Sequence, residues 1–373
     1  MPLRALARVN LAAIERNCAR LANALSPGAA LGAVVKADGY GHGAVPVARA
    51  ARAAGARWLC VATADEAAEL RAGGLDGPVL VMGALSAEEL PVALDARADL
   101  VAWREAFVGE LEAAARGLPV RVHVKLDTGM GRLGTRDPGE ADRVAERVAA
   151  APGLELAGAM THFATSDDDP EFLAEQLGAF ASWARALAQR NPGVLLHAAN
   201  SAATLAEPAS HFDLVRCGIA VYGMDPFHED PVARGLEPAL ELSSYVAEVK
   251  DAAPGQSAGY GRRFVAERPT RIATLPIGYG DGIRRALTND CDVLVRGRRH
   301  PLVGTVSMDN VTIDVGPDSD VAPGDLAVFI GRDGEERQTA EELARRMGTI
   351  NYEVACGISA RVPRVYHRDG QPA

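Results

Sequence analysis

The sequence predicts an α/β protein with an N-terminal (β/α)8 TIM-like barrel and a C-terminal mainly-β domain. Three observations support this architecture. The chain has 373 residues, enough for one barrel of roughly 250 residues and a smaller second domain. As far as residue 217, eight short apolar runs alternate with stretches rich in Ala, Glu and Arg. Beyond residue 235 the apolar runs are broken by Gly, Pro and Asp, which is typical of short β-strands.

The first predicted element is a helix over residues 11–25, where apolar residues recur at helical spacing and Asn10 is the expected N-cap. Strands are predicted at residues 31–35, 57–62, 78–82, 98–102, 120–126, 154–160, 194–199 and 212–217. Helices are predicted between them at residues 43–54, 65–72, 86–94, 104–116, 139–150 and 171–190. Near-continuous apolar strands favour a parallel sheet covered on both faces, and eight such strands close a barrel. An open doubly wound sheet is the alternative, but its G-x-G-x-x-G fingerprint is missing from LGAVVKADGYGHG.

We place the domain boundary after residue 235, so that the barrel covers residues 1–235 and the β-rich domain covers residues 236–373. Strands are predicted in the second domain at residues 240–250, 270–277, 291–297, 301–306, 311–315 and 325–330. One helix is predicted at residues 339–347, with Thr339 as its N-cap and Glu342 completing a capping box.

Composition excludes several classes of protein. Acidic residues outnumber basic residues by 49 to 39, which gives a net charge of −10 and argues against a general binder of nucleic acid or anionic membranes. The five cysteines contain no C-x-x-C pair, so neither a disulfide framework nor a metal site is expected. No apolar run approaches the length of a membrane span, and Glu15 and Arg16 interrupt any signal-peptide core. We therefore expect a cytoplasmic protein.

Lys36 is the first candidate for chemistry, because it follows an apolar strand and precedes a glycine-rich turn. In a (β/α)8 barrel the C-terminal ends of the strands line the active site. Partial burial there lowers the pKa of a lysine and makes its amine a nucleophile that can form a Schiff base with an aldehyde. Position alone leaves a second interpretation open, in which Lys36 is a surface lysine at a strand end.

The string KADGYGHG at residues 36–43 resembles the cofactor-lysine motif of the alanine racemases, whose usual form is close to K-A-N-A-Y-G-H-G. The resemblance implies that the cofactor is pyridoxal 5'-phosphate, that Lys36 binds it covalently and that Tyr40 contacts its phosphate. Asp38 and Gly39 replace the common Asn and Ala, and both residue types suit a turn. Similarity to this family extends along almost the whole chain.

Further segments add residues to the implied site. KLDTGMGRLG at residues 125–134 is similar to the family segment in which Arg132 approaches the substrate carboxylate. Lys125 matches a lysine that is carbamylated in some members. The resemblance also implies that His162 lies near the cofactor.

The same resemblance implies that Ser201 and the backbone of Gly218 and Ile219 bind the cofactor phosphate, and that Tyr352 also contacts it. In barrels, phosphate usually binds at the loops after the last two strands. Ser201 and Gly218 follow the seventh and eighth predicted strands, so the two arguments agree.

Arg216 is the residue that the resemblance places opposite the pyridine nitrogen of the cofactor. Its permanent charge disfavours a second positive charge on that nitrogen. The ring then stabilises a carbanion less than it does beside a carboxylate, which suits an enzyme that returns the proton to Cα.

Racemisation requires proton removal on one face of Cα and delivery on the other, and two bases meet this requirement best. The resemblance implies that Lys36 and Tyr260 are these bases, Lys36 for the D-enantiomer and Tyr260 for the L-enantiomer. It also implies that Tyr260 enters from the partner subunit of a homodimer. It further implies that the Met308 backbone binds the substrate carboxylate and that Tyr279 lines the entrance.

Taken together, the resemblance implies an isomerase that interconverts L-alanine and D-alanine on a pyridoxal-phosphate aldimine and supplies D-alanine for peptidoglycan. A racemase acting on serine or another small amino acid is the nearest alternative. A barrel-type pyridoxal-phosphate decarboxylase is a second alternative, against which Arg216 argues. A third alternative is a pyridoxal-phosphate-binding barrel without strong catalysis. Proteins of that kind lack a β domain, so the presence of residues 236–373 argues against it.

Overall fold

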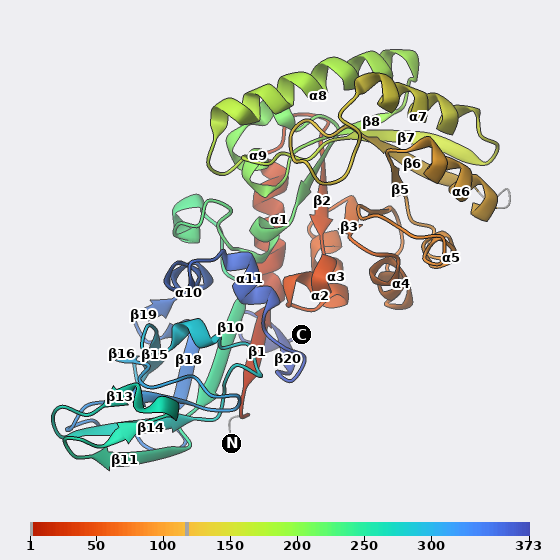
Figure 1. Cartoon of the computed structure of the whole chain (residues 1–373). Helices are drawn as coiled ribbons and strands as arrows, with labels where there is room; N and C mark the ends of the chain where they lie inside the picture. The colour runs from red at the N-terminus through yellow and green to blue at the C-terminus, as the bar shows by residue number, and fades with distance from the viewer. Residues whose placement is uncertain (1–2, 116–118) are drawn as a thin grey trace. The chain divides into compact units, whose positions relative to one another are not determined.

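The computed structural model describes residues 3–115 and 119–373 (Figure 1). The chain divides into two compact units. Ile14–Val221 form the first, here called the barrel unit, and Met1–Ala13 with Tyr222–Ala373 form the second, here called the β-rich unit. The predicted boundary after residue 235 therefore differs from the structural division, both at its position and in the placement of the N-terminal segment.

Parallel strands form the core of the barrel unit. They are β2 (Ala30–Val34), β3 (Trp58–Val61), β4 (Val79–Val81), β5 (Leu100–Ala102), β6 (Val120–Lys125), β7 (Leu154–Met160), β8 (Leu195–His197) and β9 (Leu214–Cys217). These are the eight strands that the sequence predicts. Every residue of β2, β3, β4, β5 and β9 is buried, which explains their continuous apolar character.

Two junctions close these strands into a barrel. Pairing runs in the order β4-β3-β2-β9 and β5-β6-β7-β8. A parallel bridge between Leu80 and Asp99 joins β4 to the start of β5. The backbone N–H of Arg216 donates to the Ala199 carbonyl at 2.9 Å and joins β9 to the end of β8. The predicted (β/α)8 barrel is confirmed.

Helices cover the outside of the strands, as Figure 1 shows for α7 and α8 over β6, β7 and β8. The helices are α1 (Leu11–Asn23), α3 (Ala44–Ala53), α4 (Ala64–Ala72), α5 (Leu90–Asp95), α6 (Glu105–Ala115), α7 (Pro138–Ala150), α8 (Pro170–Arg190) and α9 (Ser201–Ala206). The predicted N-cap of α1 is confirmed, since the Asn10 side chain accepts from the Ala12 N–H at 3.1 Å. Residue 116, the predicted end of α6, lies outside the described residues.

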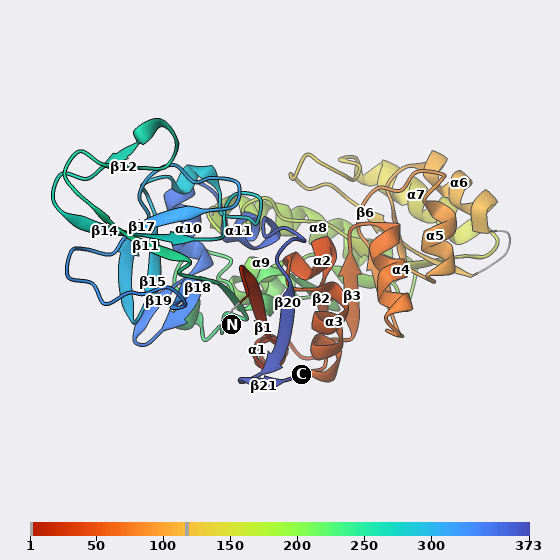
Figure 2. The same cartoon turned by 90° about the horizontal axis from the view of Figure 1, so that it is seen from below.

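The β-rich unit contains one large sheet in the order β16-β15-β18-β10-β1-β20-β21, and β19 pairs with β18. A smaller sheet has the order β11-β14-β17, seen side by side in Figure 2, and β12 pairs with β13. The strands are β1 (Leu6–Asn10), β10 (Leu240–Tyr245), β11 (Glu248–Ala252), β12 (Ser257–Ala258), β13 (Phe264–Val265), β14 (Thr270–Leu275), β15 (Asp292–Val295), β16 (Arg298–Pro301), β17 (Val311–Asp314), β18 (Leu326–Asp333), β19 (Glu336–Gln338), β20 (Arg364–Arg368) and β21 (Gln371–Pro372).

The position of β1 explains why the N-terminal segment belongs to the β-rich unit. β1 lies between β10, with which it pairs antiparallel, and β20, with which it pairs parallel. Its main-chain groups therefore bond to segments more than 200 residues away in the sequence.

Two predicted strands need correction. The strand expected at residues 240–250 is two strands, β10 and β11, which belong to different sheets. The strand expected at residues 301–306 does not form, because the backbone changes its pairing partner after β16 ends at Pro301: the Leu302 N–H donates to Cys291, whereas the Val303 N–H donates to Thr312.

The predicted helix at residues 339–347 is α10 (Ala340–Met347), and its N-cap is confirmed, since Thr339 accepts from the Glu342 N–H at 3.2 Å. The Glu342 carboxylate pairs with Arg299 at 2.7 Å instead of completing the predicted capping box. A second short helix, α11 (Asn351–Cys356), was not predicted. In the described part of the chain, no helix has both the length and the apolarity needed to cross a membrane.

Candidate active site

Lys36 begins a tight left-handed turn directly after β2. Ala37, Asp38 and Gly39 all have positive φ, between 51° and 59°, which is costly for residues other than glycine. Asp38 offsets part of this cost, because its carboxylate accepts from the Ala44 N–H at 2.9 Å. The Ala37 N–H donates to Glu66 at 2.7 Å. The aspartate at this position is therefore compatible with the turn, as predicted, and backbone strain of this kind is concentrated at functional sites.

Five of the predicted site residues follow or end neighbouring strands at the same mouth of the barrel and affect one another electrostatically. These residues are Lys36, Lys125, Arg132, His162 and Arg216. Burial, with Arg216 and Arg132, lowers the pKa of Lys125 from 10.5 to about 8. Burial, Arg216 and Lys125 hold the pKa of His162 well below 6.5. The mouth is thus rich in positive charge and suits an anionic ligand.

Arg216 lies on β9 and is 2% exposed. Its Nη2 donates to the carbonyl oxygens of Thr161 at 2.8 Å and Ala198 at 2.9 Å, and its Nη1 contacts His197 Nδ1 at 2.9 Å. Burial lowers the pKa of Arg216 to about 10, so the group stays charged at neutral pH. Within the described residues, the buried Nε of Arg216 has no hydrogen-bond partner. One donor of a fixed guanidinium is therefore left for a ligand.

Tyr40, Ser201 and Gly218 meet at the loops after β8 and β9. The Gly218 N–H donates to Ser201 Oγ at 2.9 Å, and the Ala220 N–H reaches the same oxygen at 3.4 Å. A Cβ on Gly218 would lie 3.0 Å from Tyr40 Cζ and closer still to the hydroxyl. Ile219, completely buried, begins the short helix that follows. This arrangement of hydroxyls and backbone N–H groups can bind a phosphate.

Asp127 organises the loop that carries Arg132, and sequence reasoning missed it. The Asp127 carboxylate accepts from the N–H groups of Gly129 at 3.1 Å and Gly131 at 3.0 Å. Burial acts to raise the pKa of Asp127, but these N–H donors and Arg136 lower it below its usual value. The signal was the spacing D-x-G-x-G, in which an aspartate can accept from the next two glycines.

The other predicted residues belong to the β-rich unit. Tyr260, Tyr279 and Met308 are 75%, 42% and 52% exposed, which is unusual for side chains of their size. Hydrogen bonds connect their loops, because the Tyr279 N–H donates to the Ser307 carbonyl and the Thr305 hydroxyl donates to the Tyr260 carbonyl. The structure thus gathers three of the predicted residues on neighbouring loops of this unit.

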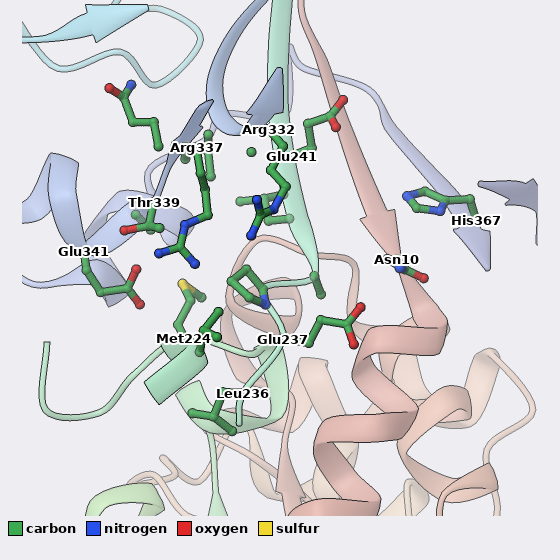
Figure 3. Close-up of a pocket in the computed structure, with 18 residues that line it drawn as sticks. Asn10, Met224, Leu236, Glu237, Glu241, Arg332, Arg337, Thr339, Glu341 and His367 are labelled. Atoms are coloured by element: carbon green, nitrogen blue, oxygen red, sulfur yellow. The ribbon is translucent and has the colours of Figure 1, made fainter. Parts of the chain in front are cut away.

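Tyr352 lies on α11 of the β-rich unit, with its ring 6.3 Å from that of His228. Its phosphate contact stays a prediction. The same unit contains a cavity of about 310 Å³. Figure 3 shows residues that line it, among them Met224, Leu236, Arg332 and Arg337. None of the predicted site residues lines this cavity, so we do not assign the chemistry to it.

Comparison with known proteins agrees with these features. The family model of the alanine racemase N-terminal domain matches residues 9–226, and that of the C-terminal domain matches residues 239–366. An alanine racemase from Thermobifida fusca is 44% identical over 368 residues, covering 96% of this chain and 97% of that protein. Alanine racemase 2 from Caldanaerobacter subterraneus subsp. tengcongensis is 40% identical over 367 residues, covering 97% and 95%.

Solved structures give the same result. The crystal structure of alanine racemase from Bacillus anthracis with bound L-Ala-P superimposes with a TM-score of 0.92 and 36% identity, covering 100% of this chain and 97% of that chain. Alanine racemase from the D-cycloserine producer Streptomyces lavendulae gives a TM-score of 0.92 at 39% identity, covering 98% of each chain. The charged barrel mouth, the β-rich unit and these similarities lead to one conclusion: the chain belongs to the alanine racemase family.

Proposed function

We propose that this protein is a pyridoxal-phosphate-dependent racemase that interconverts L-alanine and D-alanine. The observation that carries the proposal is the buried Arg216 guanidinium, held by Thr161, Ala198 and His197 with its Nε lacking a partner in the described residues. It lies at the same mouth of the barrel as Lys36, whose charge acts on neighbouring Lys125 and His162.

The residues present fit this cofactor. Tyr40, Ser201 and the backbone at Gly218 and Ile219 would hold the phosphate, and the missing side chain of Gly218 lets Tyr40 approach, since a Cβ there would lie 3.0 Å from Tyr40 Cζ. Nε of Arg216 would face the pyridine nitrogen. When bound, pyridoxal phosphate supplies an electron sink that acidifies the Cα proton of an amino acid.

The chain itself supplies the groups that move and hold protons. The amine of Lys36 would take or return the Cα proton on one face of the substrate. The charge of Arg216 would disfavour a proton on the ring nitrogen of the bound cofactor, which would favour return of the proton to Cα. Arg132 binds the substrate carboxylate, for which a planar guanidinium is well suited.

Tyr260 is the proposed base on the opposite face, and we propose that it comes from the partner subunit of a homodimer. Its 75% exposure, and the exposure of Tyr279 and Met308 on neighbouring loops, support a surface that a second subunit covers. Met308 would bind the substrate carboxylate through its backbone, and Tyr279 would line the entrance. A cytoplasmic location and a supply of D-alanine for peptidoglycan belong to the same proposal.

We further propose that Lys125 carries a carbamate. Only the neutral amine adds to CO2, and a pKa of about 8 makes an appreciable fraction of it neutral at physiological pH. The amine nitrogen bonds to the carbon of CO2 and loses one proton, which replaces a cation by an anion beside Arg132. A carbamate signal in the 13C NMR spectrum in 13C-bicarbonate buffer, absent in Lys125→Met, tests this modification.

The function is tested by loading the purified protein with pyridoxal phosphate, reducing it with borohydride and locating the modified peptide by mass spectrometry. We expect modification of Lys36 in the wild-type protein and none at this position in Lys36→Ala. Chiral chromatography of products from a panel of L-amino acids then identifies the substrate. Racemic alanine supports the proposal, racemic serine favours the broader alternative, and release of CO2 without racemisation supports a decarboxylase.

A further inference from the structure

A line of polar side chains crosses the interior of the barrel unit, where apolar side chains usually pack. It starts at Arg216, whose Nη1 lies 2.9 Å from His197 Nδ1. His197 Nε2 lies 2.8 Å from His123 Nδ1, and His123 Nε2 lies 3.1 Å from Asp99 Oδ2. Asp99 precedes β5, His123 is within β6, and His197 ends β8. The line therefore runs from the amino-terminal end of the barrel to its mouth.

The two end groups, Arg216 and Asp99, determine which nitrogen of each histidine in this line carries the proton. A guanidinium only donates, so His197 Nδ1 must accept and its proton must be on Nε2. His197 Nε2 then donates to His123 Nδ1, which places the His123 proton on Nε2, facing a carboxylate that only accepts. Both imidazoles are therefore neutral, in agreement with the depressed pKa of His197, which burial and the charge of Arg216 cause.

Packing shows that the line is built into the core. His123 and His197 are completely buried, and Asp99 is 5% exposed. A Cβ on Gly158 of β7 would lie 2.8 Å from His123 Cγ, so glycine makes room for this ring. Trp58 packs edge-on against His123 with ring centres 5.7 Å apart. At the outer end, Arg121 donates to Asp99 at 2.9 Å and also pairs with Glu155.

We propose that Asp99 and His123 are positioning residues for the cofactor site, acting through His197 on Arg216. They hold His197 as a neutral acceptor, which fixes Nη1 of Arg216 while the carbonyls of Thr161 and Ala198 fix Nη2. The guanidinium then has one orientation, and Nε is the donor left for the ring nitrogen. The role toward the ring rests on the proposed function, whereas the proton order does not.

The proton order is tested without cofactor, by two-bond 1H–15N correlation spectra of the full chain labelled with 15N-histidine. We expect His123 and His197 both to be neutral with the proton on Nε2. A charged ring, or a proton on Nδ1 of either residue, would overturn the proposal. His123→Leu and His197→Leu assign the two signals.

The positioning role is tested by the dissociation constant for pyridoxal phosphate. His123→Leu leaves the His197 N–H without an acceptor, and we expect roughly tenfold to hundredfold weaker binding. His123→Asn offers an oxygen near the place of Nδ1 and should restore binding to within about threefold of wild type. The matched control is His211→Asn, which changes another buried histidine, bonded to Ser26 and Thr204, outside the line.

The outcomes separate the two proposals. Equal binding by wild type and His123→Leu, or equal losses in His123→Leu and His211→Asn, would overturn the positioning role. Failure of the wild-type protein to bind the cofactor would overturn the proposed function and the role toward the ring, while the histidine spectra still decide the proton order.

Discussion

The substitution Gly218→Ala tests the phosphate site with a single methyl group. Gly218 has no positive φ, so alanine is compatible with its backbone and the effect is steric. The new Cβ would lie 3.0 Å from Cζ of the buried Tyr40 and closer to its hydroxyl, so the ring must retreat by about 1 Å to reach ordinary contact. Overpacking of this kind costs about 2 kcal/mol, which corresponds to roughly thirtyfold weaker cofactor binding if the phosphate requires the hydroxyl in place.

The assay is equilibrium titration of the apoprotein with pyridoxal phosphate. The double variant Gly218→Ala/Tyr40→Phe lacks the closest clashing atom, so its loss of affinity should be smaller than the sum of the two single losses. Gly178→Ala is the control, since nothing lies within 4 Å of its new Cβ and the site is on the exposed side of α8. Wild-type affinity in Gly218→Ala, or additive losses in the double variant, would show that the contact between Gly218 and Tyr40 does not shape the phosphate site.

Three further predictions concern protons and charge. The pKa of Lys125 is lowered from 10.5 to about 8 in the folded state, so the unfolded chain binds this proton more tightly. The free energy of unfolding should therefore rise as the pH increases from about 8 to about 10.5. Denaturant titrations in CO2-free buffer should show this rise, about 3 kcal/mol at most, in wild type and not in Lys125→Met. Tyr260→Phe should abolish Cα–H exchange of L-alanine with D2O while D-alanine continues to exchange through Lys36; equal losses, measured by NMR, would reject the division between two bases. Arg132→Lys should raise KM for alanine roughly tenfold or more through loss of a bidentate contact, and an unchanged KM would remove Arg132 from the carboxylate site.

Much of the fold could be predicted because the barrel strands carry a local signal. Strands such as β2 and β9 are buried along their whole length, and continuous apolar runs record this directly in the sequence. β1 has no comparable signal, because its place is decided by pairing with Ser243 and Arg364, far away in the chain. For the same reason, the sequence does not indicate that the N-terminal segment belongs to the β-rich unit.

The candidate site likewise contains residues with a local sequence signal and residues without one. Lys36, Tyr40 and Arg132 occur in strings whose order is itself informative, so these residues could be named from sequence. His123 and Asp99 could not, because each looks like an ordinary residue of its own strand. Their importance appears only when closure of the barrel brings β5, β6, β8 and β9 around one interior.

The proposed position of the buried Arg216 guanidinium is opposite the ring nitrogen of bound pyridoxal phosphate. It is tested most directly by the 15N chemical shift of that nitrogen in the loaded protein, with 15N-labelled pyridoxal phosphate. An unprotonated nitrogen in the wild-type protein, and a protonated one in Arg216→Glu, is the predicted result. A protonated nitrogen in the wild-type protein would show that Arg216 does not control the charge of the ring.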